Sequence, residues 1–591
     1  MSFDPAPDPA PKSRARWLFP LAFLFLTFAF CGGLALLLLS AAASATKVAR
    51  GTILELKLSA EIPEGPSEVL APFPSLAGPP SIFEVREALS AAAKDANIAG
   101  LRVDIELAQA GFGAASELQA ALDAFRQAGK PVYAYLRGDF VSDLDYALAL
   151  GADRIWLPPS AAVAVNGFHA EVTFWKGTLD KLHIEPQYFM FKEYKGAGEP
   201  MSRSEMSPEF RESTTALLTD IWEDFLGRIA RRRKLEPEAV RATASLGVMT
   251  AAEAQAAKWV DELGYEDQFK EALRKSASAD RYKGLGVRRY LQHLAVSRAT
   301  LTGERMAVVF GSGTIVATAA GGPFDDGGFS GPRVARAVRE AADDDLVKGI
   351  LLRVDSPGGS VVGSDHVWRA VEYARKDRKK PVVVSMSSLA ASGGYYVSMG
   401  ADAIVAWPAT ITGSIGVVFG KLNIAGLYQL AGAHIDTIKV GENADILSFV
   451  KTMSPEQQAR VRGWMESTYE EFKRKVGDGR KLDPVKVEEL ARGRVWSGSD
   501  GLDLGLVDRL GGYDDAIALL REKCGLGADT RVDLVVYPAQ RTFLDVLLND
   551  EIGLDATALL ARLDPAAALR ERLEELARPG AWLLMPAIRI R

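Results

Sequence analysis

The sequence predicts an α/β protein that consists of two tandem copies of one domain, preceded by a transmembrane helix. Three observations support this prediction: a charge-free apolar run near the N-terminus, segments that recur at a constant spacing, and helical patterns that alternate with short apolar strands within each copy. Such alternation is typical of βα units that build a largely parallel sheet.

The charge-free run covers residues 17–45, and its Leu- and Phe-rich part, residues 18–39, has the length of a helix that crosses a lipid bilayer. A cleaved signal peptide has a shorter apolar centre of about 7 to 15 residues, so we expect an uncleaved anchor, although residues 43–45 also resemble a processing site. Basic residues flank the run on both sides, so charge does not predict which side of the membrane the remaining chain faces.

Matched segments reveal the duplication. KPVYAYL from Lys130 matches KPVVVSM from Lys380, and GADRIWLPP from Gly151 matches GADAIVAWP from Gly400. Lys130 and Lys380 lie 250 residues apart in the sequence, which is the size of one α/β domain. We therefore expect a short cytoplasmic tail, the anchor, a first copy, a second copy and a C-terminal helical tail, over residues 1–16, 17–45, 46–300, 301–537 and 538–591.

Each copy contains an amphipathic helix that leads into an apolar strand, over residues 81–104 in the first copy and 330–355 in the second. The apolar residues of the helical part recur at the spacing of a face that packs on a sheet. Longer helices are predicted over residues 206–233 and 453–476, because each opens with a Ser-Pro-Glu sequence that suits a first turn.

Composition argues against several classes of function. The 591-residue chain has 25% charged residues and a formal net charge of -6, so its surface gives no indication of nucleic-acid binding. Its two cysteines, Cys31 and Cys524, indicate neither a disulfide framework nor a thiolate metal cluster. We expect no cofactor and no metal.

Chemistry is expected where the two copies differ. The second copy contains LAASGGYY around Ser392 and VDSPGGS from Val354, whereas the matching segments of the first copy, VSDLDYA and VDIELAQ, lack both glycine pairs. Glycines beside a helix start allow close backbone approach and leave N–H groups free. The amides of Gly358 or Gly359 and of Gly393 are therefore candidate oxyanion donors. The same residues are also compatible with simple tight turns and a helix cap at Ser392.

A base for Ser392 is not evident among the five histidines, because none lies close to it in the sequence. A neutral lysine can act as the base when burial lowers its pKa from about 10.4. The segment QYFMFKEYKGAGEP, residues 187–200, is expected to place Lys192 and Lys195 on opposite faces of an apolar strand. This spacing leaves both lysines open as candidates, and it is equally compatible with solvated surface charges.

Together, LAASGGYY, VDSPGGS, TGSIGV and EYKGAGEP resemble the motifs of the signal peptide peptidase A (protease IV) family in its long, duplicated form. The resemblance covers nearly the whole chain, anchor included, and is least specific beyond residue 538. It implies two crotonase-like (ClpP-like) domains in tandem, a homotetramer and a dyad shared between the copies. In that dyad Ser392 is the nucleophile, Lys195 is the general base and Ser414 orients the lysine.

The resemblance further implies a serine endopeptidase of the bacterial cytoplasmic (inner) membrane that degrades cleaved signal peptides and other apolar peptides. Its catalytic part is expected on the periplasmic side. Two alternatives from other classes are a crotonase-like acyl-CoA enzyme and a non-catalytic membrane scaffold. A soluble metabolic enzyme needs no anchor, and the sequence shows no recognisable adenine or phosphate site, which argues against the acyl-CoA enzyme.

Overall fold

The computed structural model describes residues 48–59, 61–67, 69–70, 78–297, 302–318, 328–542, 580–585 and 589–590. The anchor predicted over residues 17–45 lies outside these ranges. Within them, no helix combines the length and the apolar character that a membrane crossing requires.

The first copy is built on a six-stranded sheet with the order β11-β6-β4-β3-β1-β12, in which every pairing is parallel. The helices α2 (Ile82–Lys94) and α3 (Phe112–Gln127) pack on this sheet. The side chain of Ser81 accepts a hydrogen bond from Glu84 N and begins α2 in a capping box. The strands are β1 (Thr52–Leu58), β3 (Ile98–Ile105), β4 (Val132–Leu136), β6 (Arg154–Leu157), β11 (Glu262–Leu263) and β12 (Gly284–Gly286).

The second copy repeats this arrangement. Its sheet has the order β22-β20-β18-β16-β13-β24. In addition, β19 pairs with β18 and β23 pairs with β19, and among these pairings only β20–β22 is antiparallel. The strands are β13 (Glu304–Ser312), β16 (Val347–Ser356), β18 (Val382–Ala391), β19 (Ala403–Ala406), β20 (Ile411–Gly413), β22 (Val495–Ser497), β23 (Arg509–Leu510) and β24 (Val532–Tyr537).

The order of elements is the same in the two copies. In the first, α2, β3, α3 and β4 lead to α4 (Asp143–Ala149) and β6. In the second, α12 (Gly331–Asp343), β16, α13 (Val361–Glu372) and β18 lead to α14 (Gly393–Ser398) and β19. The duplicated α/β fold predicted from the sequence is therefore confirmed.

Both faces of the second sheet are covered, and the first copy supplies part of the cover. Alternate residues of β13 and β16 pack on α12 and α13 at one face, and on α19 (Tyr513–Lys523) at the other. Ile82 and Phe83 of α2 and Ala114 of α3 join the second group. The two copies therefore share a continuous apolar core, which holds them in a fixed relation.

A third sheet joins the copies and contains the residues around the candidate site. Its order is β15-β14-β17-β26-β21-β9. The strand β9 (Glu185–Phe191) of the first copy pairs antiparallel with β21 (Val417–Asn423) of the second along its whole length. The other members are β14 (Ile315–Val316), β15 (Phe329–Ser330), β17 (Gly358–Ser360) and β26 (Gly580–Leu584).

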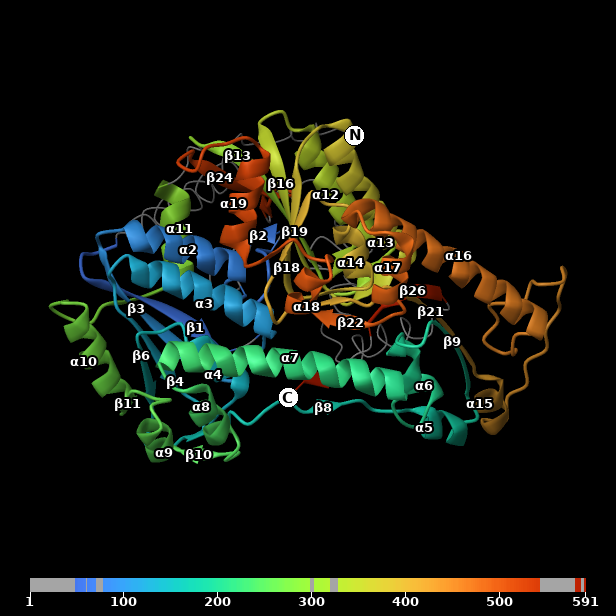
Figure 1. The fold of residues 1–591 in the computed structure, drawn as a ribbon, viewed down its shortest axis with the longest axis horizontal. Helices are drawn as coiled ribbons and strands as arrows, with labels where there is room; N and C mark the ends of the chain where they lie inside the picture. Colours follow the sequence, from blue (N-terminus) through green and yellow to red (C-terminus); the bar gives the residue numbers. More distant parts are fainter. Residues whose placement is uncertain are drawn as a thin grey trace, which may run out of the picture.

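The two long helices are α7 (Pro208–Arg233) and α16 (Pro455–Arg480), close to the expected ranges. Ser207 and Ser454 cap them by accepting hydrogen bonds from the backbone N–H groups of Phe210 and Gln457. Figure 1 shows α7, in green, running from the first copy beneath the second, where it contacts β22.

Most of the C-terminal helical tail expected over residues 538–591 lies outside the described residues. The described residues beyond 538 form strands, namely β25 (Arg541–Thr542), β26 and β27 (Arg589–Ile590), and none of them is helical. Because β17 and β21 offer pairing edges to β26, tertiary context decides the conformation here.

Candidate active site

Ser392 lies at a sharp turn between strand β18 and helix α14. Its backbone has φ 56° and ψ −111°, a conformation that costs a non-glycine residue about 1–3 kcal/mol and that recurs at functional sites. The turn is held because Ser392 N–H donates to Gly413 O at 2.8 Å and Tyr396 N–H donates to Ser392 O at 2.8 Å. The Ser392 side chain is fully buried and does not cap α14, so the helix-cap interpretation is wrong.

Lys195 of the first copy meets Ser392 of the second. The Lys195 Nζ atom lies 2.7 Å from Ser392 Oγ, 2.8 Å from Ser414 O and 3.0 Å from Ser414 Oγ. Lys192 is exposed and forms an ion pair with Glu488, with Nζ and Oε1 3.4 Å apart. Of the two candidate lysines, the structure therefore brings only Lys195 to the serine.

Lys195 does not reach the site from a face of strand β9, as the sequence analysis expected. β9 ends at Phe191, and the chain turns at Lys192, which has φ 81°. Lys195 then precedes a short 3-10 turn, Gly196–Gly198. The alternation of side chains in a strand ends with the strand, so the prediction that the two lysines lie on opposite strand faces is wrong.

Burial sets the protonation state of Lys195. The side chain is 1% exposed, and desolvation holds the pKa of its amine well below the usual 10.5. A neutral amine has two N–H donors and one lone pair. The two donors match the carbonyl and hydroxyl oxygens of Ser414, and the lone pair can accept the Oγ–H of Ser392. The three contacts are therefore those of a base directed at Ser392.

Gly493 positions Lys195 and was missed by the sequence analysis. A Cβ atom on Gly493 would lie 2.6 Å from both N and Cβ of Lys195, and Gly493 has φ 83°. The neighbouring backbone completes the support, since Tyr194 N–H donates to Arg492 O at 3.1 Å and Ser414 N–H donates to Arg494 O at 2.7 Å. A glycine in the segment ARGRVW gives no sequence signal that distinguishes it from an ordinary turn.

The candidate oxyanion donors also come together. A Cβ atom on Gly393 would lie 3.0 Å from Gly358 Cα and 3.1 Å from Gly359 N, so the Ser-Pro-Gly-Gly turn lies against the start of α14. Gly358 has φ 97° and Gly359 has φ 151°, which favour glycine. The N–H of Gly358 donates to Ser356 Oγ at 3.1 Å, which fixes the turn.

The first copy has a structural residue where the second has the candidate nucleophile. Ser142 precedes α4 as Ser392 precedes α14, but its side chain caps the helix in a capping box with Asp145. Asp143 is buried, which raises its pKa to about 6, and it accepts backbone hydrogen bonds from Asn166 and Gly167. These contacts stabilise the turn, and they engage the Ser142 hydroxyl in the helix cap.

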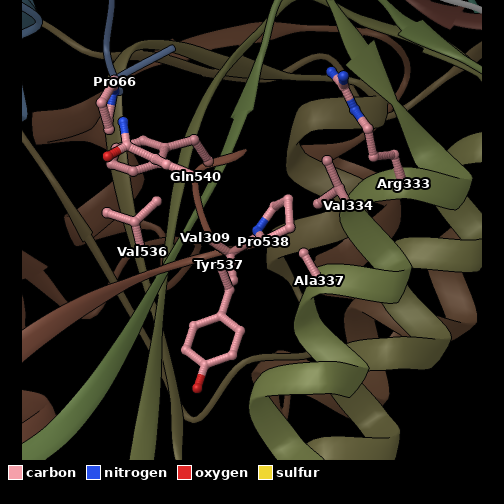
Figure 2. A pocket seen from close by; sticks show the side chains of 10 residues that line it. Pro66, Val309, Arg333, Val334, Ala337, Val536, Tyr537, Pro538 and Gln540 are labelled. Carbon is pink, nitrogen blue, oxygen red and sulfur yellow. The ribbon is translucent and has the colours of Figure 1, made fainter. Parts of the chain in front are cut away.

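A separate pocket lies between β13, β24 and α12. Figure 2 shows side chains that line it, among them Val309, Val334, Val536 and Tyr537. None of the candidate catalytic residues borders this pocket, so it is distinct from the Ser392 site.

Comparisons with known proteins identify the family of the chain. The sequence model of peptidase family S49 matches residues 124–280 and 374–527. The chain is 35% identical to "Protease 4" of Salmonella typhi, with 80% of this chain and 76% of that protein covered. It is 30% identical to "Serine protease SPPA, chloroplastic" of Arabidopsis thaliana, with 84% and 74% covered, and 31% identical to "Protease 4" of Haemophilus influenzae, with 86% and 81% covered.

Among solved structures, "ClpP1 from Listeria monocytogenes" aligns with 35% of this chain and 92% of its own length. The sequence identity is 14% and the TM-score is 0.21.

Proposed function

The chain belongs to peptidase family S49 and is a serine-type endopeptidase, and we propose that it cleaves peptide bonds with a Ser392–Lys195 dyad shared between its two copies. The observation that carries the proposal is the 2.7 Å separation of Lys195 Nζ and Ser392 Oγ inside a buried site. Membership in this family argues against both alternatives, the acyl-CoA enzyme and the non-catalytic scaffold.

The mechanism follows from the protonation state of the lysine. Neutral Lys195 accepts the proton of Ser392 as Oγ attacks the carbonyl carbon of the peptide. The amides of Gly393 and Gly359 stabilise the oxyanion, a contribution of about 3–4 kcal/mol per donor, whereas the N–H of Gly358 already donates to Ser356 Oγ. The lysine then gives its proton to the leaving nitrogen, and water hydrolyses the serine ester with Lys195 again as the base.

Ser414 orients the base during these steps. Its carbonyl and hydroxyl oxygens accept the two N–H groups of the neutral amine, which leaves the lone pair directed at Ser392. When Lys195 is protonated, the same two oxygens, which are uncharged, stabilise the ammonium group. Ser414 thereby supports proton transfer without raising the pKa of the lysine as an anionic partner would.

For the substrate we propose cleaved signal peptides and other apolar peptides. A relative from Enterococcus faecium, 35% identical over 225 residues, bears the name "Putative signal peptide peptidase SppA". Apolar side chains from both copies cluster beside the nucleophile, which suits an apolar peptide. They belong to Leu217, Ile221, Ala391, Ala409 and Val495.

We also propose that the protein is anchored in the bacterial cytoplasmic membrane by residues 17–45, with its catalytic part on the periplasmic side, and forms a homo-oligomer, a tetramer. An exposed apolar arm after α15 (Ala425–Leu430) supports association, since the side chains of Ile438 and Val440 are 96% and 89% exposed. Light scattering of the full chain in detergent tests this, because Ile438→Asp should yield smaller particles. Unchanged particle mass argues against the arm as an interface.

A fluorophosphonate probe tests the dyad. We expect labelling of Ser392 in the unmodified protein and loss of labelling in Ser392→Ala and in Lys195→Ala. Lys192→Ala, which removes the neighbouring exposed lysine, should keep it. Undiminished labelling in Ser392→Ala, or in Lys195→Ala, would remove the proposed nucleophile or base.

A further inference from the structure

The segment that carries Lys195 leaves the sheet before it reaches the active site. Strand β9 pairs with β21 as far as Phe191, and the chain then turns. Lys192 and Glu193 are exposed. Tyr194 is partly buried, and the side chain of Lys195 is 1% exposed. Tyr194 therefore lies where the chain passes from the surface into the active site.

Arg494 of the second copy contacts Tyr194 across the junction between the copies. Its guanidinium carbon lies 5.2 Å from the centre of the Tyr194 ring and 4.6 Å from the centre of the Trp496 ring, distances at which a cation is attracted to an aromatic face. Arg494 Nη1 also lies 3.0 Å from Glu212 Oε1 of helix α7, and the Tyr194 hydroxyl donates to Glu212 Oε2 at 3.3 Å. Arg494, Tyr194 and Glu212 thus contact one another across the two copies.

The Trp496 ring connects Arg494 to the turn that carries the serine. Arg494 and Trp496 are two residues apart at the start of β22, so their side chains lie on one side of the strand, while Val495 points to the apolar cluster on the other. A Cβ atom on Gly413 would lie 2.6 Å from Trp496 Cδ1, and Gly413 O accepts the N–H of Ser392 at 2.8 Å. The contacts of Arg494 therefore extend from the lysine segment to the serine turn.

The backbone of Arg494 holds the residue that orients the lysine. Arg494 O accepts the N–H of Ser414 at 2.7 Å, and two oxygens of Ser414 contact the amine of Lys195. Ser414 has φ 51°, a conformation that a non-glycine residue keeps only when its surroundings hold it. The side chain of Arg494 thus contacts the segment of the base, while its carbonyl holds the partner of the base.

Exposure decides which contact of the lysine turn is strongest. The charged groups around the turn pair with one another, and they are Lys192, Glu193, Glu212, Glu488, Arg492 and Arg494. The side chains of Lys192 and Arg492 are 36% and 46% exposed, whereas that of Arg494 is 23% exposed. Ion pairs at exposed positions contribute little to stability, and Glu212 is itself 56% exposed. A contact between a cation and a ring strengthens when water is excluded, which favours the contact of Arg494 with Tyr194.

We propose that Arg494 is a positioning residue, which clamps Tyr194 and thereby keeps Lys195 packed against Ser414 and away from water. The proposal rests on the assignment of Lys195 as the base. Because burial is what lowers the pKa of the Lys195 amine, a loosened turn that admits water raises that pKa again. At a pH below the pKa, an increase of about one unit lowers the fraction of neutral amine about tenfold.

The pH dependence of fluorophosphonate labelling tests the clamp in the full-length protein. In the unmodified protein the labelling rate should rise with pH as Lys195 loses its proton. In Arg494→Met, which removes the cation but keeps an unbranched side chain, this rise should move to higher pH by about one unit, with labelling about tenfold slower below it. Tyr194→Ala should produce the same shift. Tyr194→Phe keeps the ring, so it should follow the unmodified protein.

Arg462→Met is the matched control. Arg462 of α16 also belongs to the second copy, and its guanidinium carbon lies 4.6 Å from the centre of the Phe189 ring in β9. It makes the same kind of contact between the copies, but with the paired strand and not with the turn that leads to Lys195. Its pH profile should match that of the unmodified protein. Equal profiles in the unmodified protein, in Arg494→Met and in Tyr194→Ala overturn the proposal, because a merely structural role lowers the melting temperature without moving the profile.

Hydrogen exchange separates this proposal from the dyad, because it needs no catalysis. In the full-length Ser392→Ala protein, Tyr194 N–H donates to Arg492 O at 3.1 Å and Gly196 N–H donates to Tyr194 O at 2.9 Å. Arg494→Met should speed the exchange of these amides about tenfold and leave β9 unchanged, and Arg462→Met should not affect them. A pH-dependent rise in labelling that is absent, or that persists in Lys195→Ala, contradicts the dyad. Unchanged exchange at residues 194–196 in Arg494→Met overturns the clamp.

Discussion

Replacing Gly493 by alanine should displace Lys195 without changing any reacting group. The added Cβ would lie 2.6 Å from Lys195 N, whereas ordinary contacts begin at 3.4 Å, so the lysine segment has to move by about 0.8 Å. That shift is enough to lengthen the Nζ–Oγ contact from 2.7 Å to about 3.5 Å, beyond a useful hydrogen bond. Misplacement of about 1 Å costs on the order of 100-fold in rate, so we expect a loss of that size in kcat/KM.

The assay compares kcat/KM for a fluorogenic apolar peptide, the rate of fluorophosphonate labelling and the melting temperature. Alanine also strains the left-handed backbone at Gly493, so Gly525→Ala is the control, because Gly525 has φ 68° and no atom within 4 Å of an added Cβ. Both variants should lose about 1 kcal/mol of stability from this strain. Activity of Gly493→Ala within twofold of Gly525→Ala would refute the positioning role.

Three further predictions concern buried charge. The rate should fall as pH drops through the lowered pKa of Lys195, because the protonated amine cannot act as a base, and a flat kcat/KM between about pH 6 and 9 contradicts this. Lys195→Met should abolish hydrolysis and raise the melting temperature at neutral pH. Because burial lowers the pKa of Lys195 in the folded protein, the unfolded chain binds one more proton there, and this difference destabilises the folded state at neutral pH. A lower melting temperature of Lys195→Met argues against the desolvated amine. Arg353→Met should destabilise the protein by about 3–5 kcal/mol in urea titrations, because it leaves Glu64 and Glu117 buried without their partner; a loss below about 1 kcal/mol contradicts this.

The sequence was informative where the two copies differ. The glycine pairs beside Ser392 occur only in the second copy, and no histidine lies nearby, which directed attention to a lysine base. The structure places Lys195 in contact with both Ser392 and Ser414, the three residues that the family resemblance implied. Local pattern left Lys192 and Lys195 equivalent, because the alternation argument holds only within a strand, and β9 ends before either lysine.

Long-range packing could not be read from the sequence. Gly493 matters because a segment about 300 residues away in the chain lies against it, and a local pattern carries no information on that approach. The Gly580–Leu584 segment is apolar and short, so the sequence was compatible with core packing or membrane contact. Its conformation depends on two edges, in β17 and β21, that exist only after the second copy has folded.

The division of the dyad between the copies makes the base depend on their docking. Lys195 belongs to the first copy, but residues of the second copy lie against it, among them Ser414, Gly416 and Gly493. Without that cover, the amine would be solvated and protonated at neutral pH, because desolvation is what lowers its pKa. Docking through β9 and β21 therefore brings the lysine to Ser392 and lowers the pKa of its amine, so we expect the proposed nucleophile to be activated only in the assembled chain.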